Sequence, residues 1–142
     1  MSYKVAVVGA SGNVGREILR TLAERKFPIK SLNALASKKS MGMEVSFGED
    51  KTVKCEALDN FDFKGIDFVL ASAGAKVSKE FAPRATAAGA VVIDNSSAFR
   101  MDPDVPLIIP EVNAEDLKNY KKKGIEVFKG SVDSVKSLNS LI

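Results

Sequence analysis

Residues 4–15 read KVAVVGASGNVG, and this stretch decides the fold. Its first part is a short apolar run rich in valine, which predicts a buried strand over Lys4–Val8. Its second part places glycine at positions 9, 12 and 15, and the apolar spacing that follows predicts a helix from about Asn13 to Arg25. A strand, a glycine-rich turn and a helix in this order form the first half of a βαβ unit.

The rest of the chain continues this alternation of strands and helices. Further strands are predicted at Leu32–Ala36, Ile66–Ala71, Ala90–Ile93 and Leu107–Ile109, a hairpin at Met43–Phe47 and Thr52–Ala57, and a helix at Ser78–Ala88. Pro83 inside that helix predicts a late start or a kink. Asn113 is predicted to cap a short helix that carries Glu115 and Asp116 in its first turn. The alternation predicts an α/β fold with a mostly parallel sheet flanked by helices.

The three glycines have separate physical roles in a dinucleotide site. Gly9 allows a sharp turn, Gly12 leaves no Cβ in the path of a pyrophosphate, and Gly15 allows the helix to approach the strand. The N–H groups at the start of the helix then point at the phosphates, and Ser11 adds a hydroxyl. The spacing differs by one residue from the plain G-x-G-x-x-G pattern. The context predicts a Rossmann-like, dinucleotide-binding domain; the alternative is a glycine turn without a ligand.

The choice of cofactor is predicted from the end of the second strand. An NAD site has an acidic residue there, which accepts a hydrogen bond from the ribose 2′-hydroxyl. Here Ala36 runs into Ser37-Lys38-Lys39-Ser40, and no carboxylate occurs before Glu44. Two lysines and two serines suit a 2′-phosphate by charge and by hydrogen bonding, so we expect NADP. The alternative is a solvated loop whose lysines contribute only solubility.

Composition excludes several other classes of function. Residues 1–120 hold 16 basic and 16 acidic side chains, and the net charge of +3 comes from the last 22 residues, so we expect no nucleic acid partner. No apolar run is long enough to cross a membrane, and no signal peptide is visible. The chain has no histidine and one cysteine, Cys55, so no zinc site is expected. A single cysteine fits a reducing, cytoplasmic location.

Several segments resemble aspartate-semialdehyde dehydrogenases over about residues 3–124. They are Val5–Gly15 (VAVVGASGNVG), Leu35–Gly42 (LASKKSMG), Ser72–Gly74 (SAG), Lys79–Pro83 (KEFAP), Gly89–Pro106 (GAVVIDNSSAFRMDPDVP) and Pro110–Asn113 (PEVN). The run Asp94–Arg100 is the most specific of them. Enzymes of that family are homo-oligomers and interconvert aspartyl phosphate and aspartate semialdehyde with NADPH, in lysine, threonine and methionine synthesis.

The resemblance implies roles for individual residues. The pyrophosphate would be held by Ser11, Gly12, Asn13 and Val14, and the 2′-phosphate by Ser37, Lys39 and Ser40. Ser72 and Ala73 would border the cofactor, and Arg100 would bind the substrate phosphate. Arg100 also lies just beyond the end of a core strand, where ligands bind in open α/β sheets. Its alternative role is a surface salt bridge with Asp102 or Asp104.

The resemblance ends after Gly124, before the segment in which the family carries its catalytic cysteine. Cys55 lies in an alternating strand and is expected to be structural. We therefore expect a cofactor-binding domain at 1–124, a divergent C-terminal tail at 125–142 that is serine-rich from Ser131, no substrate or dimerisation domain, and no turnover by the chain alone. A truncated, frameshifted or split gene product fits this pattern. A non-catalytic NADP-binding module, or one half of a split enzyme, is the alternative function.

Overall fold

The structure, a computed structural model, describes residues 1–116 and 125–128. Its strands are β1 (Tyr3–Val8), β2 (Ile29–Ala36), β3 (Glu44–Phe47), β4 (Lys51–Ala57), β5 (Phe68–Ala71), β6 (Val91–Asp94), β7 (Leu107–Ile108) and β8 (Ile125–Phe128). Its helices are α1 (Asn13–Glu24), α2 (Ala75–Ala87) and α3 (Pro110–Asn113), and two 3₁₀ turns, η1 (Lys38–Ser40) and η2 (Ala114–Asp116), complete the described elements.

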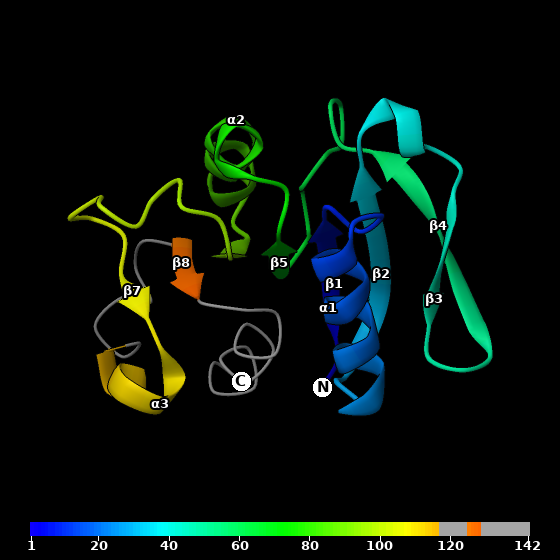
Figure 1. The fold of residues 1–142 in the computed structure, drawn as a ribbon, viewed down its shortest axis with the longest axis horizontal. Helices are drawn as coiled ribbons and strands as arrows, with labels where there is room; N and C mark the ends of the chain where they lie inside the picture. The colour runs from blue at the N-terminus through cyan, green and yellow to red at the C-terminus, as the bar shows by residue number, and fades with distance from the viewer. Residues whose placement is uncertain (117–124, 129–142) are drawn as a thin grey trace.

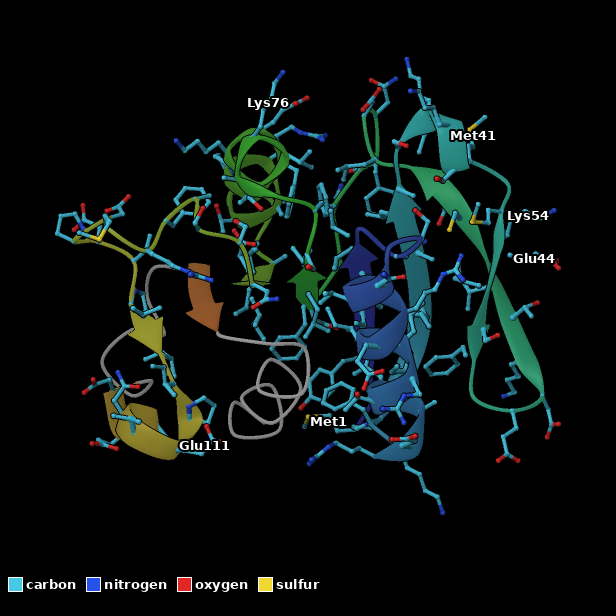
Figure 2. The ribbon with its side chains drawn as sticks, viewed as in Figure 1. Met1, Met41, Glu44, Lys54, Lys76 and Glu111 are labelled. Atoms are coloured by element: carbon cyan, nitrogen blue, oxygen red, sulfur yellow. The ribbon has the colours of Figure 1, made fainter. Side chains whose placement is uncertain are left out.

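The described strands form one sheet in the order β3-β4-β2-β1-β5-β6-β8-β7 (Figure 1). All neighbouring pairs are parallel except β3 and β4, which form the predicted hairpin. In that hairpin Glu44 is the register partner of Lys54. Both residues are labelled on the right side of Figure 2, where the hairpin lies. The predicted α/β fold with a mostly parallel sheet is confirmed.

Helices cover both faces of the sheet, which explains why Val5–Val8 of β1 is an unbroken apolar run. Alternate side chains of a strand point to opposite faces. Val5 and Val7 of β1 join the core cluster that contains Ile18, Leu19 and Leu22 of α1. Ala6 and Val8 join the cluster that contains Phe81, Ala82 and Ala85 of α2. Because helices exclude water from both faces of β1, the side chains of Val5–Val8 are apolar on both faces.

Helix α2 contradicts the late start predicted from Pro83. It begins at Ala75, three residues before the predicted start, and Pro83 lies inside it. Proline removes the hydrogen bond to the carbonyl four residues earlier, that of Lys79. Both Pro83 and Lys79 are exposed, so water can satisfy that carbonyl. An exposed helix position therefore tolerates the proline.

The short helix predicted after Asn113 is present as η2, with Glu115 and Asp116 in its first turn. Asn113 does not cap η2, because its amide oxygen accepts from a residue that precedes it. It is the last residue of α3, whose first residue is Pro110. Proline suits that first position because its φ is already helical and no N–H partner is needed. The Ile109 N–H donates to Asn113 Oδ1 at 2.7 Å, and Asn113 Nδ2 donates to the Leu107 carbonyl at 2.9 Å. Asn113 Nδ2 also donates forward, to Asp116 Oδ2 at 3.1 Å. The amide therefore links the residues before α3 to η2.

Strand β8 extends the sheet into residues that the sequence assigned to a divergent tail. Ile125–Phe128 pairs in parallel with β6 on one side and β7 on the other. The sheet therefore continues past Gly124. The serine-rich stretch from Ser131, predicted as a frayed tail, lies outside the described residues. Among the described helices, none is both long and apolar enough to cross a bilayer.

Candidate cofactor-binding site

The turn after β1 is packed so closely that two of its glycines are fixed by backbone contacts. Gly9 has a φ of +82°, and a Cβ added to it would lie 2.3 Å from the Ser72 carbonyl oxygen. A Cβ on Gly15 would lie 2.0 Å from the Gly9 carbonyl oxygen. The turn is also bonded to both neighbouring strands, since Gly9 N donates to the Leu35 carbonyl at 2.9 Å and Ser72 N donates to the Val8 carbonyl at 3.0 Å.

Gly12 differs from the other two glycines because the fold itself does not require it. Its φ is −79°, which any residue adopts, and an added Cβ would meet only the Gly9 carbonyl oxygen, at 3.4 Å. It caps α1 without a side-chain hydrogen bond. The first N–H groups of a helix have no partner within the helix, so this bare position leaves them open to an anion. The geometry fits a pyrophosphate.

A cavity of about 430 Å³ lies beside this turn, at the carboxyl edge of the parallel strands. Six predicted site residues line it, namely Gly9, Ser11, Gly12, Ser37, Ser72 and Ala73. The other lining residues are Val8, Ala36, Leu58, Asp59, Val77, Glu80, Phe81 and Arg84. Open α/β sheets bind ligands at this edge. The structure therefore brings the glycine turn, the end of β2 and the end of β5 to one cavity.

The remaining predicted residues lie outside the cavity wall, at three places. Asn13, Val14 and Gly15 form the first turn of α1. Lys39 and Ser40 belong to η1, which starts directly after Ser37 and lies at the end of β2 in Figure 1. Arg100 lies on the segment that follows β6, the strand next to β5. Its Nη2 donates to the Asn95 carbonyl at 3.3 Å.

The part of the cavity wall formed by Leu58, Asp59 and α2 was not predicted from the sequence. Leu58 and Asp59 follow β4, which pairs with β2, so both strands end at the same edge. Arg84 donates to the carbonyls of Leu58 and Phe61, each at 3.3 Å, and its guanidinium lies 5.6 Å from the centre of the Phe63 ring. Finding these residues requires the order of the strands in the sheet, which the sequence alone did not supply.

The turn that precedes Arg100 is built on a buried carboxylate. Asp94 is fully buried and accepts hydrogen bonds from Ser96 N at 2.8 Å and from Ser96 Oγ at 2.7 Å. Ser96 Oγ accepts in turn from Ala98 N at 3.2 Å. Phe99 packs against the core cluster under α2. These contacts fix the backbone that carries Arg100.

We expect Asp94→Ala to lower the free energy of unfolding by about 2 kcal/mol, since the buried Ser96 N–H and hydroxyl lose their acceptor. Chemical denaturation checks this. Asp102→Ala is the matched control, because Asp102 accepts from Asp104 N in a similar turn but is exposed. Its expected change is within about 0.5 kcal/mol. Equal losses in the two variants would show that burial of Asp94 is not what matters.

Cys55 lies in the core and not at the cavity. It is 1% exposed, sits in β4 opposite Ala34 of β2, and belongs to the cluster under α1. Burial raises the pKa of its thiol, and nearby Arg16 opposes that shift. A protonated, enclosed thiol supports the structural role expected for Cys55. In the part of the chain that the structure describes, no group of three acidic, cysteine or histidine side chains is placed to hold a metal.

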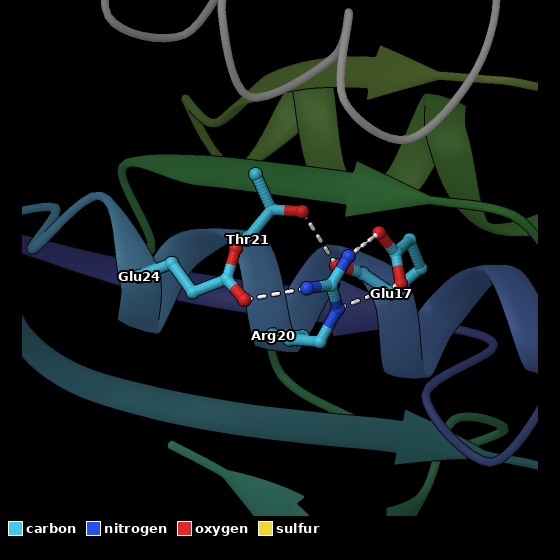
Figure 3. A network of polar contacts seen from close by, with 4 residues as sticks. All are labelled: Glu17, Arg20, Thr21 and Glu24. Atoms are coloured by element: carbon cyan, nitrogen blue, oxygen red, sulfur yellow. Dashed lines mark hydrogen bonds and ion pairs between the residues drawn. The ribbon is translucent and has the colours of Figure 1, made fainter. Parts of the chain in front are cut away.

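A second groove, of about 950 Å³, lies between α1 and the β3–β4 hairpin. Charged side chains of both signs line it. On α1, Arg20 bonds to Glu17 and Glu24 (Figure 3), and the hydrogen bond from Arg20 lowers the pKa of Glu17. The groove begins at Asn13 and runs along α1 to Lys26. Its lining holds five carboxylates against three basic side chains, an excess of negative charge that disfavours a phosphate, so the smaller cavity is the candidate site.

Comparisons with known proteins identify the family of the chain. The model of the semialdehyde dehydrogenase family, NAD binding domain, matches residues 4–120, and the chain belongs to this family. Its similar relatives are aspartate-semialdehyde dehydrogenases. That of Aquifex aeolicus is 56% identical over 126 residues, which are 88% of this chain and 37% of the relative. That of Rickettsia conorii is 54% identical over 123 residues, which are 87% of this chain and 36% of the relative.

Solved structures show the same likeness. Aspartate semialdehyde dehydrogenase II of Vibrio cholerae, complexed with ASA, superposes with a TM-score of 0.85 at 41% identity, over 90% of this chain and 42% of that one. The resemblance to aspartate-semialdehyde dehydrogenases predicted from the sequence is therefore confirmed. The chain spans a little over a third of the length of the curated relatives it matches.

Proposed function

We propose that this chain is the NADP-binding domain of an aspartate-semialdehyde dehydrogenase, which reduces aspartyl phosphate to aspartate semialdehyde. The observation that carries the proposal is Gly12. It is a glycine that the fold does not need, at the amino end of a helix and on the wall of a cavity. A bound pyrophosphate supplies the missing reason for it, because a Cβ there would occupy the space of the phosphate oxygens.

The residues around the cavity fit the parts of the cofactor. The backbone N–H groups of Ser11, Asn13 and Val14 would hold the pyrophosphate, while the Gly12 N–H already donates to the Gly9 carbonyl and Gly12 contributes by its missing Cβ. The apolar wall that includes Leu58 and Val77 would contact the adenosine. Ser72 and Ala73 would border the cofactor where it leaves the cavity. When bound, NADPH supplies the hydride. Arg100, on the segment after β6, would hold the phosphate of the substrate.

A preference for NADP is supported by the end of β2. Ser37 lines the cavity, and η1 follows it with Lys38, Lys39 and Ser40. Within the described residues the Lys39 side chain forms no hydrogen bond or ion pair, so its ammonium is available to a ligand. A doubly charged 2′-phosphate would gain a charge-assisted hydrogen bond from it, which a 2′-hydroxyl would gain only weakly.

Lys39→Ala is expected to weaken the binding of NADP by about tenfold, while the affinity for NAD changes by less than about twofold, because only the 2′-phosphate loses a charged partner. Isothermal titration calorimetry with both nucleotides measures this. Lys30→Ala is the matched control. Lys30 is an exposed lysine near the start of β2, far from the carboxyl end of β2 that leads to Lys39. Equal losses for NADP and NAD in Lys39→Ala would refute the assignment of the 2′-phosphate site.

A further inference from the structure

The structure places an acid in the cavity wall beside Ser37, although the sequence has none directly after β2. Asp59 comes from the end of the neighbouring strand β4 and lines the cavity together with Ser37. Its Oδ2 lies 3.5 Å from Nζ of Lys38, the lysine that directly follows Ser37. One of the two lysines expected to serve a 2′-phosphate is therefore already paired with a carboxylate.

The position of Asp59 is fixed by the backbone on its amino side. Leu58 N donates to the Ala36 carbonyl at 2.9 Å, so the residue before Asp59 is bonded to the residue before Ser37. The Leu58 carbonyl accepts from Phe61 N at 3.1 Å and from Arg84 Nη2 at 3.3 Å. The loop that carries Asp59 is thus bonded both to β2 and to α2, and Asp59 is held in the cavity wall.

We propose that Asp59 is a specificity-determining residue that opposes the 2′-phosphate of NADP and accepts the ribose 2′-hydroxyl of NAD, so that the domain takes both nucleotides. The inference rests on the proposed function. A carboxylate at this end of a dinucleotide site is the usual partner of the 2′-hydroxyl. Here it comes from β4 instead of β2, and it acts in two ways. It repels the phosphate directly, and it neutralises Lys38, which leaves Lys39 to provide the attraction.

The expected size of the effect follows from the exposure of the pair. The side chains of Lys38 and Asp59 are 70% and 53% exposed, so water weakens the interaction between charges at this site. Removing one negative charge about 4 Å from a phosphate in such surroundings corresponds to a gain in affinity of about fivefold. In the variant Asp59→Asn the affinity for NAD should stay the same or fall, because the asparagine side chain keeps an oxygen acceptor but loses the negative charge.

The test compares Asp59→Asn with the unsubstituted full chain by calorimetric titration of NADP and NAD. Adenosine 2′,5′-bisphosphate and AMP, titrated in the same way, isolate the contribution of the 2′-phosphate. We expect the ratio of NADP to NAD affinity, and that of the two fragments, to rise by about fivefold. Asp62→Asn is the matched control. Asp62 lies in the same loop and accepts from Lys64 N, but it is outside the cavity wall. It should leave both ratios unchanged.

The outcomes separate this inference from the proposed function. If the unsubstituted chain binds neither nucleotide, the proposed function fails and this inference fails with it. If it binds both and Asp59→Asn leaves the ratios unchanged, or changes them no more than Asp62→Asn does, the role of Asp59 is overturned while the cofactor site stands. A rise confined to Asp59→Asn supports the assignment.

Discussion

Replacing Gly15 by alanine is expected to lower the free energy of unfolding by roughly 4 kcal/mol, or to prevent folding of the chain. The added Cβ would lie 2.0 Å from the Gly9 carbonyl oxygen, 2.7 Å from the Gly9 carbonyl carbon and 2.8 Å from the Ala10 Cα. All three atoms are backbone, so no side chain can rotate away. Relief requires α1 to move from β1, which would open the contacts of Ile18 and Leu19 with the core.

Chemical denaturation followed by circular dichroism measures this effect. Gly12→Ala is the control in the same turn, because its Cβ would meet only one atom, at 3.4 Å, and its φ is compatible with alanine. Alanine caps a helix less well than glycine, so a loss of about 1 kcal/mol or less is expected there. A Gly15→Ala chain as stable as Gly12→Ala would show that the packing at Gly15 is looser than described.

Gly12→Ala is expected to weaken nucleotide binding by about thirtyfold, even though the chain stays folded. Inserting a methyl group into a filled contact costs about 2 kcal/mol, which corresponds to this change in affinity. The loss should be similar for NADP and NAD, because both carry the pyrophosphate. That pattern differs from Lys39→Ala, which affects NADP alone. The two glycines thus separate the two roles of the turn: Gly15 serves the fold, and Gly12 serves the ligand.

Much of the fold could be predicted from the sequence, because local patterns determine it. The apolar run of Lys4–Val8 and the glycine turn placed β1 and α1 within a residue of their observed bounds. Errors came where a non-local contact decides the outcome. Asn113 bonds back to Leu107 and Ile109, and β8 is a strand because β6 and β7 flank it on either side. The bonds of Asn113 leave no local signal, and the short apolar segment of β8 becomes a strand only through its two neighbours.

In the candidate site, too, the residues set by local sequence patterns were predicted and those set by non-local contacts were missed. The residues of the glycine turn and Ser37 were predicted, since each follows a strand directly in the sequence. Asp59 and Arg84 were missed because their place at the cavity depends on β4 lying next to β2 and on the packing of α2. No acid directly follows β2, as the sequence indicated, but the neighbouring strand β4 supplies the carboxylate of Asp59. Strand order therefore decides which charges meet the ribose.

The most direct test of the central claim, that the glycine turn is a pyrophosphate site, is a calorimetric titration of NADP into the unsubstituted chain and into Gly12→Ala. Each sample also needs its own unfolding curve. We expect saturable binding to the unsubstituted chain and binding about thirtyfold weaker in Gly12→Ala, with unfolding free energies within about 1 kcal/mol of each other. Equal affinities in two folded chains, or no binding to the unsubstituted chain, would contradict it.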